Sequence, residues 1–278
     1  MFTRVIAGWD GTAESQAAVE WAADRYRDLP LMLIHAIGGR PTDAEYQRAT
    51  GELSAERTRL IDVAEQLRAT HPGLHLQTET AHGSAIEALE PQLGPDTLVV
   101  VGGPDHPRAT RWTLGSRLAG RRGGGTVAVV PAVPATERPL GVVVGVDGSH
   151  ASLAAVELAA AEADRLGSSL EVVHAWQIPQ EWDTAYHEYS SDVATLEEIH
   201  HGLLDDAIEF AHGLGASPTG RLEAGRPTEV LRRLGADSAL LVVASHGARG
   251  LSRFFLGSVS HDLLVEPPSP VLIVAPRS

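Results

Sequence analysis

The strongest constraint on the fold is an internal duplication, because the chain contains two copies of one sequence unit. Residues 4–12 read RVIAGWDGT, residues 142–149 read VVVGVDGS, and an Ala-rich stretch follows each run. The offset between matched residues grows from 137 to 142 along the copies, as three pairs show: Asp10 with Asp147, His35 with His174, and Gly83 with Gly225. Small insertions produce such a drift between duplicated domains, so we expect two domains of the same fold.

The join between the copies is predicted near Pro131–Pro139. This segment, PAVPATERP, has the spaced prolines and polar residues of a semi-rigid linker. A chain of 278 residues is also long enough for two domains of ordinary size. We therefore expect the first domain at residues 1–134 and the second at residues 139–278.

Each half alternates short runs of Val, Ile and Leu with helix-like segments. Strands are expected in the first half at Arg4–Gly8, Leu31–Ala36, Leu74–Glu79, Leu98–Gly102 and Thr126–Val130. Almost continuous apolar strands separated by helices are typical of a parallel sheet that is covered on both faces. Each half is therefore predicted to be a doubly wound, Rossmann-like α/β domain. Thr12 and Ser149 are expected to cap its first helix, and the longest helices are expected within Glu45–His71 and Ser191–Leu214.

The composition excludes several classes of protein. The absence of Cys rules out disulfides, thiolate nucleophiles and Cys-ligated metals, and the absence of Lys rules out a Walker-A or Schiff-base lysine. A net charge of −14 disfavours nucleic acid as a partner. No apolar run reaches the roughly 18 residues of a membrane helix, and the N-terminus lacks a signal-peptide pattern. We therefore expect a cytoplasmic protein without a membrane partner.

The binding site is predicted where the strands end, because open α/β sheets bind ligands outside the carboxyl ends of their strands, where the strand order reverses. Asp10 and Asp147 follow the first strand of each half in a Gly-x-Asp-Gly segment that begins at Gly8 or Gly145. Each carboxylate can accept hydrogen bonds from a sugar hydroxyl or an amino group. The competing interpretation is a turn Asp that caps the following helix. The sequence leaves both interpretations open.

A second candidate element follows the fourth strand of each half, in the segments ASHGARGLSRFFLGSVS and GGPDHPRATRWTLGS. Both segments keep the same spacing between three positions: Ala244, Gly247 and Gly257-Ser258 in the second half, and Gly102, Asp105 and Gly115-Ser116 in the first. A Gly-containing loop before a helix turns backbone N–H groups toward one point, and the helix dipole favours a phosphate there.

These features resemble the universal stress protein family, whose nucleotide-binding signature is Gly-x2-Gly-x9-Gly-Ser/Thr with an Asp at the end of the first strand. The resemblance covers essentially the whole chain, twice. It implies a five-stranded parallel sheet in each domain with strand order 3-2-1-4-5, and binding of ATP together with Mg²⁺. The residues that it places at the nucleotide are Gly8, Asp10, Ala36, Gly102, Arg108, Gly115, Ser116 and Arg117 in the first half, and Gly145, Asp147, Ala175, Ala244, Gly247, Arg249, Gly250, Gly257, Ser258, Val259 and Ser260 in the second.

Both halves depart from this signature. Ala244 replaces its first Gly in the second half and adds one methyl group where the backbone approaches the ligand. Asp105 replaces its second Gly in the first half, and this carboxylate would repel phosphate oxygens. Arg108 and Arg111 occupy the same loop and can offset the repulsion, since Arg binds phosphate in bidentate fashion. The second site ranks above the first because its loop is closer to the signature.

The resemblance implies a nucleotide-responsive regulator of the stress response rather than an enzyme, although slow ATP hydrolysis stays open. No catalytic residue and no metal ligand is assigned, because His200 and His201 are adjacent rather than on one helix face. His35 and His174 are expected to form local hydrogen bonds at strand ends. The alternatives are a scaffold that acts through protein contacts alone and, less favoured, an enzyme acting on an adenylated small molecule.

The fifth strands, TVAVVP and PVLIVAP, are edge strands in the strand order that the resemblance implies. Unpaired edges are commonly covered. We therefore expect the two halves to pair through these strands as an intramolecular pseudo-dimer. The resemblance further implies a homodimer, and it leaves the protein partner unspecified.

Overall fold

The computed structural model describes residues 1–38, 46–104, 113–121, 125–132, 141–177, 190–245 and 256–275. It forms two compact units, the first mainly Met1–Val133 and the second mainly Pro134–Leu251, Phe255–Leu263 and Pro267–Ser278. Residues 133–139 of the predicted join lie outside the described ranges, so domain boundaries at 134 and 139 stay a prediction.

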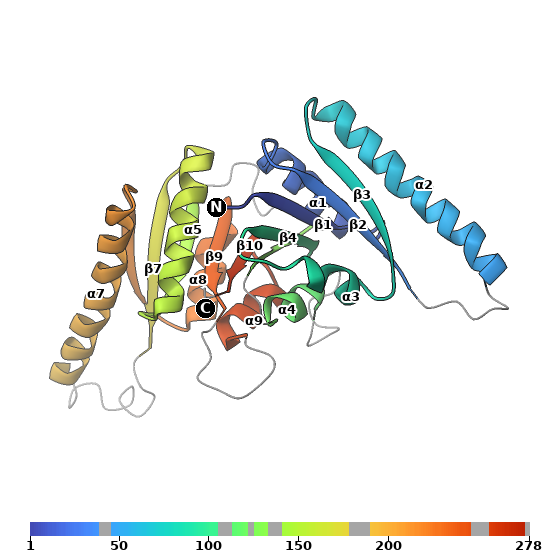
Figure 1. Ribbon diagram of the computed structural model, residues 1–278. Helices are drawn as coiled ribbons and strands as arrows, with labels where there is room; N and C mark the ends of the chain where they lie inside the picture. Colours follow the sequence, from blue (N-terminus) through green and yellow to red (C-terminus); the bar gives the residue numbers. More distant parts are fainter. Residues whose placement is uncertain are drawn as a thin grey trace. The chain divides into compact units, whose positions relative to one another are not determined.

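The first unit alternates strands and helices (Figure 1). In chain order its elements are β1 (Arg4–Gly8), α1 (Ala13–Arg25), β2 (Leu31–Ile37), α2 (Tyr46–Thr70), β3 (Leu76–His82), α3 (Ala85–Leu89), the 3-10 turn η1 (Glu90–Gln92), β4 (Thr97–Gly102), α4 (Leu114–Ala119) and β5 (Thr126–Val130). Each of the five predicted strands is present. The third strand begins two residues later than expected and continues to His82.

The second unit repeats this order. Its elements are β6 (Val142–Val146), α5 (His150–Leu166), β7 (Leu170–Trp176), α7 (Ser190–Gly213), β8 (Thr219–Ala224), α8 (Pro227–Ala236), β9 (Leu240–Ala244), α9 (Ser258–Val265) and β10 (Val271–Val274). The long helices α2 and α7 occupy the two segments in which the longest helices were expected, apart from one residue at the start of α7.

Each unit contains a parallel five-stranded sheet with the strand order 3-2-1-4-5. The first unit runs β3-β2-β1-β4-β5 and the second runs β8-β7-β6-β9-β10. The strand pairings within each unit are parallel, with Val5 opposite both Leu31 and Leu98 in the first sheet. The strand order therefore reverses between β1 and β4 and between β6 and β9, which confirms the doubly wound fold.

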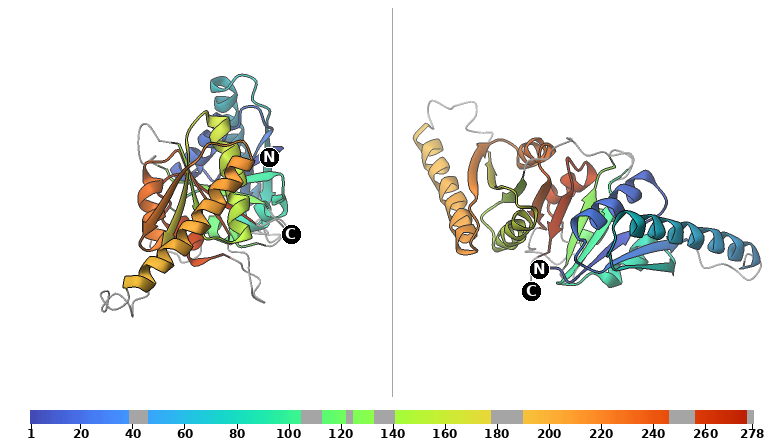
Figure 2. Two further views of the ribbon diagram at one scale, coloured as in Figure 1. Left: turned by 90° about the vertical axis from the view of Figure 1, so that its left-hand side faces the viewer. Right: turned by 90° about the horizontal axis from the view of Figure 1, so that it is seen from above.

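Burial explains why the central strands are so apolar. All five residues of β5 and of β6 are buried, as are the first five of β4. Helices cover the sheet of each unit (Figure 1 and Figure 2). In the first unit α1 contacts β1 and β4, and α3 contacts its neighbour α4. In the second unit α5 contacts β6 and β9. The outer strands β3 and β8 are mostly exposed or half-buried. No helix among the described residues is long and apolar enough to span a membrane.

The first helix of each unit begins with the predicted side-chain cap. The hydroxyl of Thr12 accepts a hydrogen bond from the Ser15 amide, and that of Ser149 accepts one from the Ser152 amide, both at 3.2 Å. These caps satisfy N–H groups that a helix start otherwise leaves unpaired. Gly11 and Gly148, directly before the caps, have φ values of +83° and +78°, which side chains rarely adopt.

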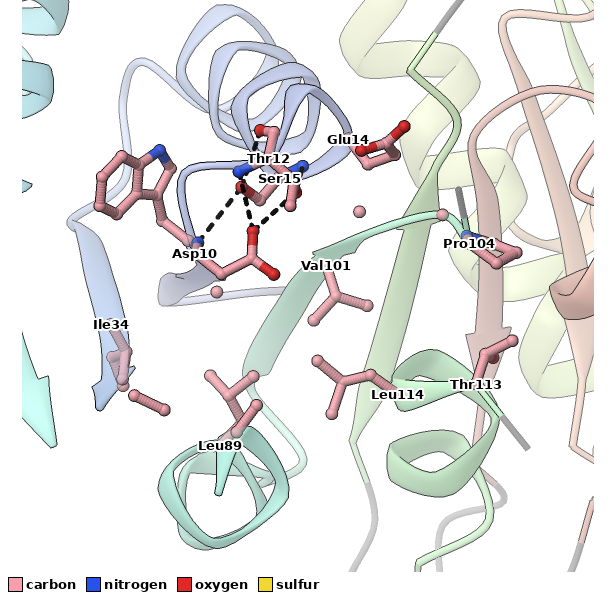
Figure 3. Close-up of a pocket in the computed structure, with 16 residues that line it drawn as sticks. Asp10, Thr12, Glu14, Ser15, Ile34, Leu89, Val101, Pro104, Thr113 and Leu114 are labelled. Atoms are coloured by element: carbon pink, nitrogen blue, oxygen red, sulfur yellow. Dashed lines mark hydrogen bonds between the residues drawn. The ribbon is translucent and has the colours of Figure 1, made fainter. Parts of the chain in front are cut away.

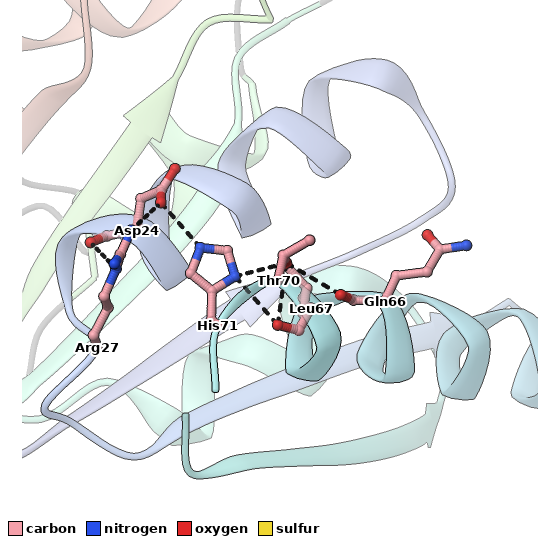
Figure 4. Close-up of polar contacts among 6 residues, drawn as sticks. All are labelled: Asp24, Arg27, Gln66, Leu67, Thr70 and His71. Carbon is pink, nitrogen blue, oxygen red and sulfur yellow. Dashed lines mark hydrogen bonds and ion pairs between the residues drawn. The ribbon is translucent and has the colours of Figure 1, made fainter. Parts of the chain in front are cut away.

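A polar cluster ties the end of α1 to the end of α2 in the first unit (Figure 4). One carboxylate oxygen of Asp24 accepts hydrogen bonds from His71 Nε2 at 2.9 Å and from Arg27 at 2.8 Å. The pKa of Asp24 lies below its ordinary value of 3.8, mainly because of the hydrogen bond from His71 and also because of Arg27, while partial burial opposes the shift. The cluster lies at the opposite end of α1 from Thr12.

Candidate functional site

The first unit has a pocket of about 440 Å³ at the carboxyl ends of β1 and β4, where the strand order reverses (Figure 3). Its volume lies within the usual range of ligand pockets, roughly 300–1,000 Å³. Apolar side chains form most of the lining, and Asp10, Thr12, Glu14 and Ser15 lie along one side. The residues lining it are Gly8, Trp9, Asp10, Thr12, Glu14, Ser15, Ile34, Ala36, Ala85, Leu89, Val101, Gly102, Gly103, Pro104, Thr113 and Leu114.

The second unit has a pocket of about 220 Å³ in the matching place. Its lining consists of Gly145, Val146, Asp147, Ser149, Ser152, Val173, Ala175, Pro227, Leu231, Val243, Ala244, Gly257, Ser258, Val259 and Ser260. Most of these residues match a residue of the first pocket in the repeat: Asp147 matches Asp10, Ala175 matches Ala36, Leu231 matches Leu89, and Ala244 matches Gly102. The duplicated sequence therefore builds the same pocket twice.

Asp10 and Asp147 each shape the turn beside their pocket. Asp10 Oδ1 accepts hydrogen bonds from the amide and the hydroxyl of Thr12, at 3.0 and 2.6 Å. Asp147 Oδ1 accepts the same pair from Ser149, at 3.0 and 2.5 Å. The turn interpretation thus holds for one carboxylate oxygen of each Asp. The other oxygen of Asp10 points toward the pocket in Figure 3.

These contacts keep Asp10 ionised. Its partial burial raises the pKa, but the hydrogen bonds from Thr12 and Ser15 and the nearby His35 outweigh burial and hold the pKa below the ordinary value of 3.8. Asp10 therefore presents a carboxylate at neutral pH, which can accept hydrogen bonds from a ligand but cannot donate one.

Gly102 sits where β4 meets the start of α1. A Cβ atom there would lie 2.6 Å from the backbone carbonyl carbon of Glu14, closer than atoms can approach. The absent side chain thus lets the helix start close over the strand end. Ala244 carries a Cβ atom at the matching place in the second unit, where α5 also contacts β9.

The helices that follow the two phosphate-loop candidates begin at different positions. Helix α4 begins at Leu114, and the hydroxyl of its cap, Thr113, accepts a hydrogen bond from the Ser116 amide at 3.1 Å. Ser116 is fully buried, and its hydroxyl donates to the Thr113 carbonyl at 3.0 Å. Helix α9 begins at Ser258, two positions later in the repeat, so that the exposed Ser258 lies at the helix start and lines the second pocket.

A buried histidine anchors the end of the first strand in each unit. His35 Nδ1 bonds the Trp9 carbonyl and His174 Nδ1 bonds the Val146 carbonyl, both at 2.8 Å, as predicted. The other ring nitrogen reaches the long helix, at Glu56 in the first unit (3.3 Å) and at His200 in the second (2.7 Å). Burial and the neighbouring His174 lower the pKa of His200. Both imidazoles therefore have structural partners that hold the strand ends beside the pockets.

The structure brings together most of the residues assigned from the sequence. The pockets include Gly8, Asp10, Ala36, Gly102, Gly145, Asp147, Ala175, Ala244, Gly257, Ser258, Val259 and Ser260. Three assigned residues of α4 do not line the first pocket: Gly115 packs against Val129, Ser116 is buried, and Arg117 is exposed. Six residues that were given a role from the sequence lie outside the described ranges: Asp105, Arg108, Arg111, Gly247, Arg249 and Gly250.

Sequence reasoning missed the apolar wall that α3 and α8 contribute. Leu89 and Leu231 lie at matched positions, and a Cβ atom at Gly8 or Gly145 would come within 3.0 or 2.7 Å of them. The signal was present, since AHGSAIEAL and EAGRPTEVL repeat at the same offset as the phosphate-loop segments. Among the described residues, no group of three or more His, Cys, Asp or Glu side chains could hold a metal ion without help from a ligand.

Comparisons with known proteins agree with this fold. A sequence profile of the universal stress protein family matches residues 1–119 and 141–275. A universal stress protein of Mycolicibacterium smegmatis is 31% identical over 294 residues, covering 98% of this chain and 97% of that protein. One from Mycobacterium tuberculosis is 28% identical and covers 97% and 96%. The crystal structure of a universal stress protein from Archaeoglobus fulgidus superposes with a TM-score of 0.67 at 16% identity and covers 98% of both chains. These relatives are named as stress proteins rather than as enzymes.

Proposed function

The chain belongs to the universal stress protein family, with two copies of the family's domain, and on that basis we propose that its pockets bind an adenine nucleotide. The observation that carries the proposal is the duplicated pocket at the point where the strand order reverses, with Asp10 or Asp147 on one side and Leu89 or Leu231 on the other. An apolar wall suits the base, and a carboxylate suits the ribose hydroxyls.

In the second pocket, the start of α9 would receive the phosphates of ATP. Ser258, Val259 and Ser260 line the pocket there, and the first amides of a helix lack partners within the helix. Mg²⁺ is usually held by substrate phosphates and water with one or two carboxylates, so it needs no cage of protein ligands. When bound, the ion would neutralise phosphate charge beside Asp147.

We propose a regulatory role for this binding. A ligand shifts an equilibrium only by its difference in affinity for two states, so ATP would have to favour one conformation, dimer or partner-bound form. Pairing of the two halves through β5 and β10, and homodimer formation, belong to this proposal as the associations that ATP would bias. A protein-contact scaffold that binds no nucleotide is the outcome to exclude.

The test is a count of bound nucleotide followed by a matched pair of variants. Small molecules released from the denatured protein are identified by mass spectrometry, and the emptied protein is titrated with Mg-ATP. Asp147→Ala should weaken ATP binding about 10- to 100-fold, because the ligand would lose hydrogen bonds to a charged group. Asp205→Ala, which removes an exposed carboxylate of α7, should leave binding unchanged. If no nucleotide is released and no heat of binding is measured, the interpretation that remains is a scaffold that acts through protein contacts alone.

A further inference from the structure

The two pockets differ in the chemistry that they offer to a phosphate. In the second pocket, Gly257 precedes α9 and its carbonyl accepts the first helical hydrogen bond, from the His261 amide at 2.9 Å. Glycine has no side chain with which to cap the amides of Ser258, Val259 and Ser260. These residues line the pocket, and the first amides of a helix have no partner within the helix and favour an anion.

In the first unit, the amide and the hydroxyl of Ser116, which matches Ser258, are already used within α4. Thr113 caps the Ser116 amide, the Ser116 hydroxyl donates to the Thr113 carbonyl, and Ser116 is fully buried. Gly115 is buried in the first unit, where a Cβ atom on it would overlap Val129 of β5. The start of α4 reaches the first pocket through Thr113 and Leu114 but without Ser116, whereas Ser258 reaches the second pocket.

The first pocket also carries an additional negative charge. Glu14, in the first turn of α1, lines it together with the ionised Asp10 (Figure 3). The matching position in the second unit is Ala151. None of the described residues that line the first pocket is Arg, Lys or His. The carboxylates of Asp10 and Glu14 repel phosphate, whereas they accept hydrogen bonds from hydroxyl groups.

The first pocket is also larger, about 440 Å³ against 220 Å³, and Trp9, Ile34 and Leu89 give it apolar walls. We propose that the two pockets bind different forms of the ligand, an inference that rests on the nucleotide-binding function proposed above. The second binds the phosphorylated nucleotide, and the first selects an uncharged nucleoside such as adenosine and rejects phosphate.

Titration of the full chain with adenosine and with Mg-ATP tests this division. The expected stoichiometry is two adenosine but one ATP per chain. Asp147→Ala should weaken ATP binding about 10- to 100-fold and leave one adenosine site at full affinity, and Asp10→Ala should weaken one adenosine site by a similar factor and leave ATP binding intact. Two ATP per chain, with each Asp variant removing one, would overturn the inference.

A gain-of-binding variant makes the result independent of damage to the fold. Glu14→Ala installs the residue found in the second unit, and together with Thr113→Ala it should tighten ATP binding at the first pocket by about tenfold or more through loss of the repulsion. Glu20→Ala removes another carboxylate of α1 that is not part of the pocket, and it should change nothing. If one adenosine and one ATP bind per chain and compete for the Asp147 site, the division of ligands between the pockets is overturned and the proposed function stands. If neither ligand binds, the proposed function itself is wrong.

Discussion

At the scale of single residues, glycine positions set how closely helices approach the strand ends. Gly102 touches the backbone of α1, and Gly8 and Gly145 face leucines of α3 and α8. The sequence predicted that these glycines contact a ligand, and in the structure they also allow helices to pack closely against the strand ends. Both roles require the same small residue, so sequence alone cannot separate them.

Gly102→Ala should therefore destabilise the protein. The new Cβ atom would lie 2.6 Å from the Glu14 carbonyl carbon and force α1 away from β4, at a cost of about 1–3 kcal/mol. Urea unfolding followed by circular dichroism measures this loss. Gly38→Ala is the matched control, because nothing lies within 4 Å of that position. Equal unfolding midpoints for the two variants would contradict the packing role.

The same ambiguity applies to Asp10 and Asp147, for which the sequence left a turn role and a ligand role open. The structure shows that each carboxylate uses one oxygen for the turn. The sequence repeat located both residues correctly, because it reports which positions match. It could not report hydrogen bonds, since those depend on the backbone geometry around Gly11 and Gly148.

At the scale of elements, the apolar runs predicted the strands well because buried parallel strands are apolar on both faces. Their ends were less certain: the exposed β3 continues to His82, where alternation is weak. The different starts of α4 and α9 are hidden by the shared sequence LGS, and the residue before it carries the signal. Thr113 provides a capping hydroxyl for α4, whereas the matching residue in the second unit is Phe255.

The contact between α1 and α2 gives a pH-dependent prediction. Asp24→Asn should lower stability at pH 7 by less than about 1 kcal/mol, since the Asp24 side chain is 63% exposed. Because folding lowers the pKa of Asp24, its contribution is present above its ordinary value of 3.8 and disappears as the pH falls through the lower folded value.

The difference in unfolding free energy between the wild type and Asp24→Asn should accordingly shrink as the pH is lowered toward and below 3.8. Urea titrations over a pH series measure it. Asp62→Asn, which alters an exposed carboxylate of α2, serves as the control and should show no such trend. A constant difference across the series would mean that the charge of Asp24 does not stabilise the contact with His71.

At the scale of the whole molecule, the duplication predicts that ligands stabilise the units separately. ATP at 100 times its dissociation constant adds about 2.7 kcal/mol to the stability of the unit that binds it. Hydrogen exchange measured by mass spectrometry should therefore show slower exchange in β6, β9 and α9 with ATP, and no change in β1 and β4. Adenosine should slow exchange in both sets of strands. Equal protection of both units by ATP would contradict the division of ligands.

Two pockets at matching places of one polypeptide also give every experiment an internal standard. Each pocket is lined by residues of its own repeat, Gly8–Leu114 or Gly145–Ser260. A substitution in one repeat leaves the other at the same concentration, in the same buffer and with the same history of purification. The ratio of the two occupancies in a single sample therefore cancels errors in protein concentration and active fraction, which a protein with one site can remove only by comparing separate preparations.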